Sequence, residues 1–285
     1  TKNREGRPIK IEGNPDHPVN EGALCARGQA SVLNLYDPDR IRGPYRVSGG
    51  SSQPADWKTL DAEISQKLKA ARNGKVRVLS HEVTGDSTRR LIREFLGAFE
   101  SGAHVEFDPL SIDEISSAQE LSYGTALTPH YRFDQADMVV SVGADFLGQW
   151  ISPVEHARDW SKKRKIDSQN AARAQMSKLL CFESGMSITG ANADERYPIR
   201  PGDELKIVMA LANEIVDQTR YSSDSQIKSI LRTYSAQSVA EDVGGKLTAG
   251  EIKKIAQELL RHRGRSLVVA GGLSTQTEDA LALQV

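Results

Sequence analysis

The sequence predicts an α/β protein with doubly wound, mostly parallel sheets and a small β-containing unit at its N-terminus. Short β-branched runs alternate five times with longer segments whose apolar residues recur every three or four positions. One run, residues 137–142, is almost continuously apolar, which is typical of the buried middle of a parallel sheet. Strand-then-helix alternation of this kind indicates βαβ units.

The first 54 residues are expected to form the small unit and its linker. Residues 7–12 alternate and are partly β-branched, and a Gly-Asn-Pro turn follows them, which predicts a short strand. Residues 25–36 carry apolar side chains at helical spacing and precede Pro38, so they predict a helix. Residues 43–54 hold a Gly-Gly-Ser-Ser run and two prolines, and we interpret them as a linker.

Residues 55–285 are expected to form a Rossmann-like α/β region that is truncated at its C-terminus, within a fragment of a larger protein. Asp56 can cap a helix with a buried stripe of Trp57, Leu60, Ile64, Leu68 and Ala71. The predicted strands are residues 76–79, 103–107, 137–142, 178–182 and 266–270. The further predicted helices are residues 91–99, 112–123, 154–165, 203–218, 225–234, 248–261 and 276–285.

Composition excludes several classes of function. The 285 residues carry 37 basic and 38 acidic side chains, so the chain lacks the basic excess of a nucleic-acid-binding protein. No apolar run approaches the roughly 20 residues that a membrane-spanning helix needs. The six histidines are scattered and no CxxC spacing occurs, so no zinc site is predicted. Cys181 lies in an apolar strand and is expected to be a buried small hydrophobe.

Three predicted strands end in glycine or acidic loops, which is where ligands lie in open parallel sheets. The loops are residues 143–147, residues 183–185 and residues 271–276. Glycine there lets a backbone approach a phosphate or nucleotide closely. Each loop taken alone is more often an ordinary turn of an α/β protein than a ligand site.

The N-terminal segment carries a specific resemblance. The run from Gly6 to Asn20, the loop Gly22-Ala-Leu-Cys-Ala-Arg-Gly28 and Tyr36-Asp-Pro-Asp-Arg40 resemble the start of the molybdopterin oxidoreductases, the formate dehydrogenase/DMSO reductase type. The cysteine that matches Cys25 in that family is the last of four thiolates that hold a [4Fe-4S] cluster. Because this chain holds only Cys25 and Cys181, Cys25 is expected to bind metal only if upstream cysteines exist.

The same family resemblance extends along most of the chain. It implies molybdopterin guanine dinucleotide as the second family cofactor. The positions that match its cofactor-binding residues are Cys25, Arg27, Gly143, Asp145, Glu183, Asp194, Arg200 and Gly271. Of these, Glu183 matches an acid that holds a ribose, and Asp194 and Arg200 match the segment at the guanine end. Arg27 matches a basic residue between cluster and pterin, and an ordinary loop-stabilising role is equally compatible with the sequence.

Departures from the family pattern suggest that these positions are vacant here. Ser184 and Gly185 replace the usual proline and arginine after the ribose-binding acid. Residues 108–133, where active members present a ligand to molybdenum, contain no cysteine, and Ser111 and Ser122 have no special context. We therefore expect no catalytic residue, and no cofactor in this chain as given.

Segments such as Asn14-Pro-Asp-His-Pro18 and Thr189-Gly-Ala-Asn-Ala-Asp194 look most like one branch, the B subunit of alternative complex III, which oxidises quinol. That resemblance implies a domain without its own molybdenum cofactor, on the periplasmic face of the bacterial inner membrane. It also implies membrane quinol-binding, iron–sulfur and cytochrome subunits as partners. The alternative is a fragment of an active enzyme of the polysulfide reductase type. A generic nucleotide-binding domain would need a glycine fingerprint after the first main-body strand, which residues 79–85 lack.

Overall fold

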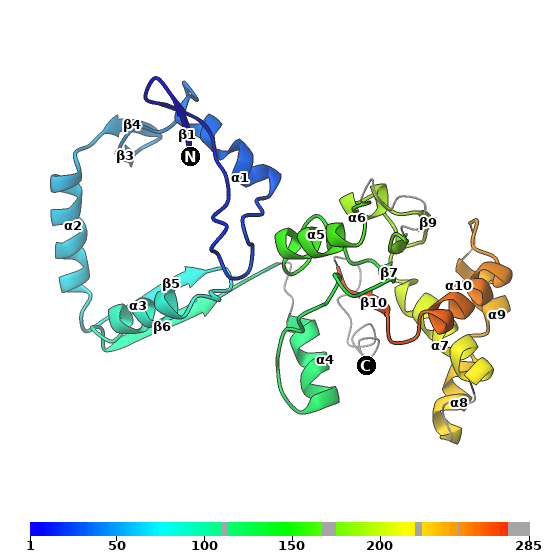
Figure 1. Cartoon of the computed structure of the whole chain (residues 1–285). Coiled ribbons are helices and arrows are strands. Elements are labelled where there is room, and N and C mark those ends of the chain that lie inside the picture. The colour runs from blue at the N-terminus through cyan, green and yellow to red at the C-terminus, as the bar shows by residue number, and fades with distance from the viewer. Residues whose placement is uncertain (110–112, 167–174, 220–223, 244, 273–285) are drawn as a thin grey trace. The chain divides into compact units, whose positions relative to one another are not determined.

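A computed structural model describes residues 1–109, 113–166, 175–219, 224–243 and 245–272 (Figure 1). The chain forms two compact units. One contains Thr1–Gln29 and Ile112–Val285, and the other contains Ala30–Ser111. The predicted domains, residues 1–54 and 55–285, stay a prediction.

A four-stranded parallel sheet forms the centre of the first unit. Its strands are β7 (Met138–Val142), β8 (Lys178–Glu183), β9 (Glu195–Pro198) and β10 (Ser266–Ala270), in the order β10-β7-β8-β9. Every residue of β7 is buried, as the apolar run predicts. The expected parallel α/β fold is therefore confirmed, and β9 is a strand that the sequence analysis did not predict.

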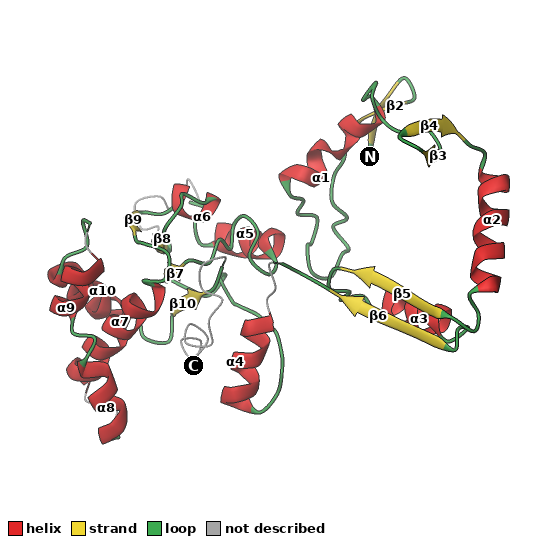
Figure 2. Ribbon diagram, turned by 180° about the vertical axis from the view of Figure 1, so that it is seen from behind, coloured by secondary structure: helices red, strands yellow, loops and turns green. Residues whose placement is uncertain are grey.

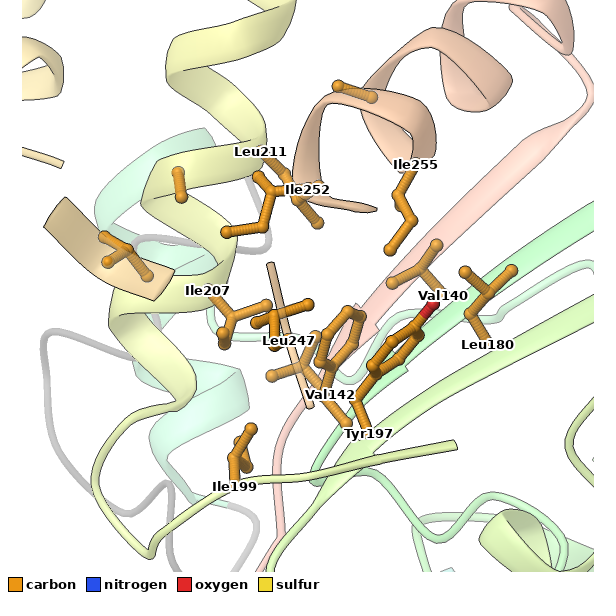
Figure 3. Close-up of a cluster of buried hydrophobic side chains, with 14 of the residues drawn as sticks. Val140, Val142, Leu180, Tyr197, Ile199, Ile207, Leu211, Leu247, Ile252 and Ile255 are labelled. Carbon is orange, nitrogen blue, oxygen red and sulfur yellow. The ribbon is translucent and has the colours of Figure 1, made fainter. Parts of the chain in front are cut away.

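Helices cover both faces of this sheet, as in a doubly wound fold (Figure 2). On one face, α7 (Glu204–Thr219), α9 (Ala236–Val243) and α10 (Ala249–Arg261) bury a large apolar cluster against the strands. Figure 3 shows Val140 and Leu180 facing Ile207 and Ile255 in this cluster.

The opposite face packs a smaller, aromatic-rich cluster. Val139 and Leu179 contact this side because successive strand residues point to opposite faces. The helices that contribute to it are α4 (Asp113–Tyr123) and α5 (Pro153–Lys162). Phe133 and Phe146 stack here with ring centroids 4.3 Å apart.

The remaining helices of this unit largely follow the predictions. Helix α8 (Ser225–Arg232) begins at Asp224, whose carboxylate accepts from the Gln226 amide at 2.8 Å. The helices that were not predicted are the short α6 (Ile188–Ala191) and α9. The predicted helix at 276–285 lies outside the described residues.

The second unit contains two separate small sheets. Strands β5 (Lys75–Ser80) and β6 (Ser101–Glu106) pair in parallel, with α3 (Asp86–Leu96) between them in the chain. Strands β3 (Tyr45–Ser48) and β4 (Ser51–Pro54) form an antiparallel hairpin. The prediction of a linker over 43–54 was wrong because Gly49 and Gly50, both at positive φ, make a tight two-residue hairpin turn.

Helix α2 (Trp57–Ala70) begins at Asp56 as predicted, since the Asp56 carboxylate accepts from the Thr59 amide at 2.9 Å. The prediction that its apolar stripe is buried was wrong for the described structure, where Trp57 is 63% exposed and no residue of α2 is buried. Helical spacing sets an amphipathic helix, but burial also requires another element to pack on the stripe.

The N-terminal segment of the first unit is a short antiparallel pair followed by a loop. Strands β1 (Lys2–Arg4) and β2 (Arg7–Lys10) pair, and α1 (Ala26–Ala30) follows the loop. The predicted helix 25–36 is thus a short α-helix that continues as the 3-10 turn η1 (Ser31–Leu35). In the ranges that the structure describes, no helix is both long and apolar enough to cross a membrane.

Candidate functional site

The loops after β10, β7 and β8 meet at the carboxyl edge of the sheet. The Gly143 amide donates to the Phe182 carbonyl at 2.8 Å, and the Gly271 amide donates to the Val142 carbonyl at 3.2 Å. Gly143 has φ of 72° and Gly271 has φ of 144°. A Cβ on Gly272 would lie 2.3 Å from the Gly143 carbonyl oxygen, so this close backbone approach requires glycine. The structure therefore brings Gly143, Glu183 and Gly271 together.

Glu183, at the end of β8, is buried and hydrogen-bonded to groups of its own chain. Its Oε1 lies 2.5 Å from Arg196 Nε, and both carboxylate oxygens accept from the Ser187 amide at 3.2 Å. Burial acts to raise the pKa of Glu183, but the hydrogen bonds from Arg196 and Ser187 outweigh it and hold the pKa below the ordinary value. The group is therefore an ionised carboxylate inside an ion pair.

Asp145, in the loop after β7, has a comparable internal role. Its Oδ1 accepts from the Thr189 amide at 3.0 Å and from the Thr189 hydroxyl at 2.8 Å. The Thr189 hydroxyl in turn accepts from the Leu147 amide at 3.0 Å. Asp145 and Glu183 thus bind the same short segment, Ser187 to Thr189, at the start of α6.

Asp194 and Arg200 flank β9 at its two ends. Asp194 precedes the strand, at the amino edge, where its Oδ2 accepts from Arg164 Nη1 at 2.8 Å and from the Leu179 amide at 2.8 Å. Arg200 follows the strand at the carboxyl edge and pairs with Asp203 at 3.1 Å. The structure therefore separates Asp194 from the glycine loops and leaves Arg200 on their side of the sheet.

Cys25 is exposed and immediately precedes α1. Its Sγ accepts from the Gly28 amide at 3.4 Å, and this hydrogen bond lowers the pKa of the thiol below its ordinary value. Arg27 lies two residues further along, within α1. Cys181 is buried, as predicted, and burial together with the nearby Glu183 charge raises the pKa of its thiol.

A cavity of about 450 Å³ lies beside α4, in the segment expected to lack a molybdenum ligand. Its lining residues are Gln119, Tyr123, Thr125, Leu127, Pro129 and Tyr131. None of these is a thiolate or carboxylate. Ser122 lies on α4 outside this lining, and Ser111 lies outside the described residues.

The sequence analysis missed a polar network on α5. His130 Nε2 lies 3.0 Å from Glu155 Oε1, and the possible ligand atoms of His130, Glu155 and Asp159 all lie within 4.8 Å of one another. Asp159 Oδ1, however, accepts from both Arg158 and Lys162 at 2.8–2.9 Å. Two cations already balance its charge, so the network forms structural ion pairs. In the sequence, the only sign of this network is the i,i+4 spacing of Glu155 and Asp159, because His130 comes from a separate loop.

Comparison with known proteins shows which proteins this chain is similar to. Residues 1–37 match the Molybdopterin oxidoreductase Fe4S4 domain. The chain is 26% identical over 283 residues to the menaquinone reductase, molybdopterin-binding-like subunit of Nitratidesulfovibrio vulgaris, covering 97% of this chain and 39% of that protein. It is 23% identical over 301 residues to the thiosulfate reductase molybdopterin-containing subunit of Salmonella typhimurium, covering 98% of this chain and 36% of that protein.

A solved structure shares the fold. Acetylene hydratase from Pelobacter acetylenicus superposes with a TM-score of 0.61 at 17% identity, covering 94% of this chain and 37% of that chain. The chain thus spans less than two-fifths of the length of each of these proteins. Three findings point to the same group of proteins. They are the match of residues 1–37, the relatives that align with nearly the whole chain, and the parallel sheet with Gly143, Gly271 and Gly272 at its carboxyl edge, which we call the glycine edge. Along nearly its whole length the chain is similar to molybdopterin-binding subunits of the formate dehydrogenase/DMSO reductase type, and its first 37 residues match the Fe4S4 domain of molybdopterin oxidoreductases.

Proposed function

We propose that this chain is a molybdopterin oxidoreductase-like domain of a respiratory, membrane-associated complex that oxidises quinol, and that it holds no molybdenum cofactor of its own. The observation that carries the proposal is the state of Glu183. The acid expected to hold a ribose is 6% exposed and paired with Arg196 and the Ser187 amide. A buried carboxylate that is already charge-paired gains little from a sugar hydroxyl.

The residues present do not fit the family cofactors. A Cβ on Gly271 would lie 2.6 Å from Trp150 Nε1 and a Cβ on Gly272 2.3 Å from the Gly143 carbonyl oxygen, so these two glycines make room for the chain's own atoms. Glu183 and Asp145 both bind the segment at the start of α6. An iron–sulfur cluster needs four thiolates, so Cys25 would hold one only together with cysteines outside residues 1–285. The predicted cofactor positions, Arg27, Asp194 and Arg200 included, are in this proposal inherited from the family and vacant.

The proposed partners are membrane quinol-binding subunits with iron–sulfur and cytochrome subunits, and the proposed location is the periplasmic face of the bacterial inner membrane. A relative named as a molybdopterin-binding-like subunit of a menaquinone reductase, matching 97% of the chain, supports a place in a complex that acts on a quinone/quinol pair. Within the chain, we propose that residues 1–54 correspond to the family's cluster domain and residues 55–285 to its α/β region. The resemblance to the B subunit of alternative complex III supports quinol as the electron donor.

Elemental analysis of the full-length protein, purified with its complex, tests the proposal. We expect quinol:acceptor activity and molybdenum and tungsten contents far below one atom per chain. The Salmonella thiosulfate reductase subunit, prepared in the same way, provides the control for cofactor retention. Molybdenum or tungsten near one atom per chain would refute the proposal.

The second candidate function is an active molybdopterin-dependent oxidoreductase of the polysulfide reductase type. It is supported by the molybdopterin-containing thiosulfate reductase relative, which matches 98% of the chain, and by the exposed Cys25 with its lowered pKa. Reduction of polysulfide or thiosulfate by the molybdenum-containing protein would establish this candidate. The absence of that activity from a preparation that oxidises quinol would eliminate it.

A further inference from the structure

The segment that precedes Cys25 is an ordered loop held together by its own groups. His17 Nδ1 accepts from the Val19 amide at 3.3 Å and from the Asn20 amide at 3.1 Å. The Glu21 amide donates to the His17 carbonyl at 3.0 Å. A Cβ on Gly13 would lie 2.5 Å from the carbonyl oxygen of Gly22, so the two ends of the loop are in close contact. We call residues 13–23, which end two residues before Cys25, the Cys25 loop.

Arg158 on α5 contacts this loop from a distant part of the sequence, within the same compact unit. Its Nη1 donates to the Val19 carbonyl and lies 3.3 Å from Glu21 Oε1. The Arg158 side chain is only 16% exposed. One guanidinium group therefore contacts a backbone oxygen and a carboxylate of the loop from a largely buried position.

The guanidinium is oriented before it meets the loop. Arg158 Nε and Nη2 donate to Asp159 Oδ1 at 2.9 and 2.8 Å, and the Asp159 side chain is 6% exposed. Because Arg158 is planar and held on one edge by Asp159, its remaining N–H groups point in a fixed direction. Charge-assisted hydrogen bonds of this kind are about twice as strong as neutral ones.

Helix α5 also has a defined place relative to the glycine edge. It follows directly on the loop that begins at Gly143 and contains Asp145. Its residue Trp160 packs in the aromatic-rich cluster against the sheet. A residue that attaches the Cys25 loop to α5 therefore fixes that loop against the same body that carries the glycine edge.

We propose that Arg158 is a positioning residue that docks the Cys25 loop on α5. This proposal depends on the proposed function in one respect. It takes the part of the chain that contains the Cys25 loop as the counterpart of the family's cluster domain. Without the Arg158 guanidinium, the loop keeps its internal hydrogen bonds but loses its attachment to the sheet unit, and its amides open more often.

Hydrogen exchange followed by mass spectrometry on the full-length protein in its complex tests the proposal. In Arg158→Ala, exchange of the Val19, Asn20, Glu21 and Ala23 amides is expected to accelerate by about tenfold or more. Exchange in β7 and β8 is expected to stay unchanged. Arg158→Lys is expected to restore part of the protection, because an ammonium can still reach the loop but cannot form the fork with Asp159.

Two further variants keep the test decisive. Arg132→Ala removes a neighbouring arginine that pairs with Asp134, and it is expected to leave loop exchange unchanged. Glu21→Gln removes only the ionic contact and is expected to accelerate loop exchange several-fold, which provides the answer if Arg158→Ala fails to fold. Unchanged loop exchange in folded Arg158→Ala, or in Glu21→Gln when that variant is the one measured, overturns the proposal. The proposed function is tested separately by metal content, which does not affect the comparison of exchange rates between these variants.

Discussion

At the scale of single residues, the polar side chains at the candidate site bind one another. Glu183 holds Arg196 and Ser187, Asp145 holds Thr189, and Asp159 holds Arg158. A buried charge is tolerated only when it is paired and hydrogen-bonded, and Glu183 and Asp159 meet that condition, whereas Asp145 is half-buried and hydrogen-bonded to Thr189. The sequence shows the acids but not the Glu183–Arg196 and Asp145–Thr189 pairs, because the proximity of these residues depends on strand order.

Gly190 tests whether the Glu183 carboxylate is fixed in place. A Cβ on Gly190 would lie 1.7 Å from Glu183 Oε1, whereas a Cβ on Gly185 would meet nothing within 4 Å. Gly190→Ala is expected to lower the free energy of unfolding by about 1–3 kcal/mol, because the carboxylate must leave Arg196 or the backbone must shift. Gly185→Ala is expected to change it by less than about 0.5 kcal/mol.

Urea unfolding followed by tryptophan fluorescence measures both variants. Alanine normally stabilises a helix more than glycine does. A Gly190→Ala variant that is more stable than the wild type would therefore show that the Glu183 carboxylate moves aside freely, contrary to this prediction.

His156 should make stability depend on pH. The side chain is 1% exposed, and burial lowers its pKa to about 4 from an ordinary value of 6.5. Between these pH values the unfolded chain binds a proton that the folded chain excludes, so the free energy of unfolding falls as pH falls. The full effect is roughly 3 kcal/mol by the lower end of this window.

His156→Phe is expected to remove this pH-dependent loss, because phenylalanine suits the surrounding rings of Tyr131, Phe133 and Trp150 and does not titrate. His130→Phe provides the control, since the His130 side chain is 60% exposed. Urea unfolding over a series of pH values measures both. Equal pH dependence in the wild type and in His156→Phe would contradict the prediction.

At the scale of elements, prediction succeeded where burial dictates the sequence. Strands β7, β8 and β10 are apolar runs because both faces of the sheet are covered, and their residues could be assigned with errors of one position. Strand β9 was missed because Glu-Arg-Tyr-Pro at the sheet edge has no such pattern. The β3–β4 hairpin was missed because all its residues are exposed, which leaves only the Gly-Gly turn as a signal.

Helix α10 offers a test of a single terminus. The Thr248 hydroxyl accepts from the Glu251 amide at 3.2 Å, and Glu251 Oε2 accepts from the Thr248 amide at 2.6 Å. Thr248→Ala is expected to cost about 1 kcal/mol, since it leaves the amide of the first turn without its acceptor. Thr248→Ser keeps the hydroxyl and is expected to keep most of the stability. Thermal unfolding should separate the two by a few degrees, and equal midpoints would mean that the capping box contributes nothing measurable.

At the scale of the whole molecule, the two compact units differ in how they are stabilised. In the first, β7 is buried on every residue between two apolar clusters. In the second, β5 and β6 form a two-stranded sheet in which Leu79 is 73% exposed. Isolated two-stranded sheets are marginally stable in water, so the second unit should open at lower free energy.

Hydrogen exchange across the whole protein should therefore show the slowest amides in β7 and β8 and much faster amides in β5 and β6. Ile255→Ala in α10 provides the decisive comparison, because Ile255 is buried in the large apolar cluster of the first unit. Its removal costs about 2–5 kcal/mol, which should raise exchange in β7 and β8 while exchange in β5 and β6 stays unchanged. If both sets of strands accelerate together, the two units unfold as one cooperative body. If only β7 and β8 accelerate, the stability of the glycine edge and of its acids, Asp145 and Glu183, depends on the first unit alone.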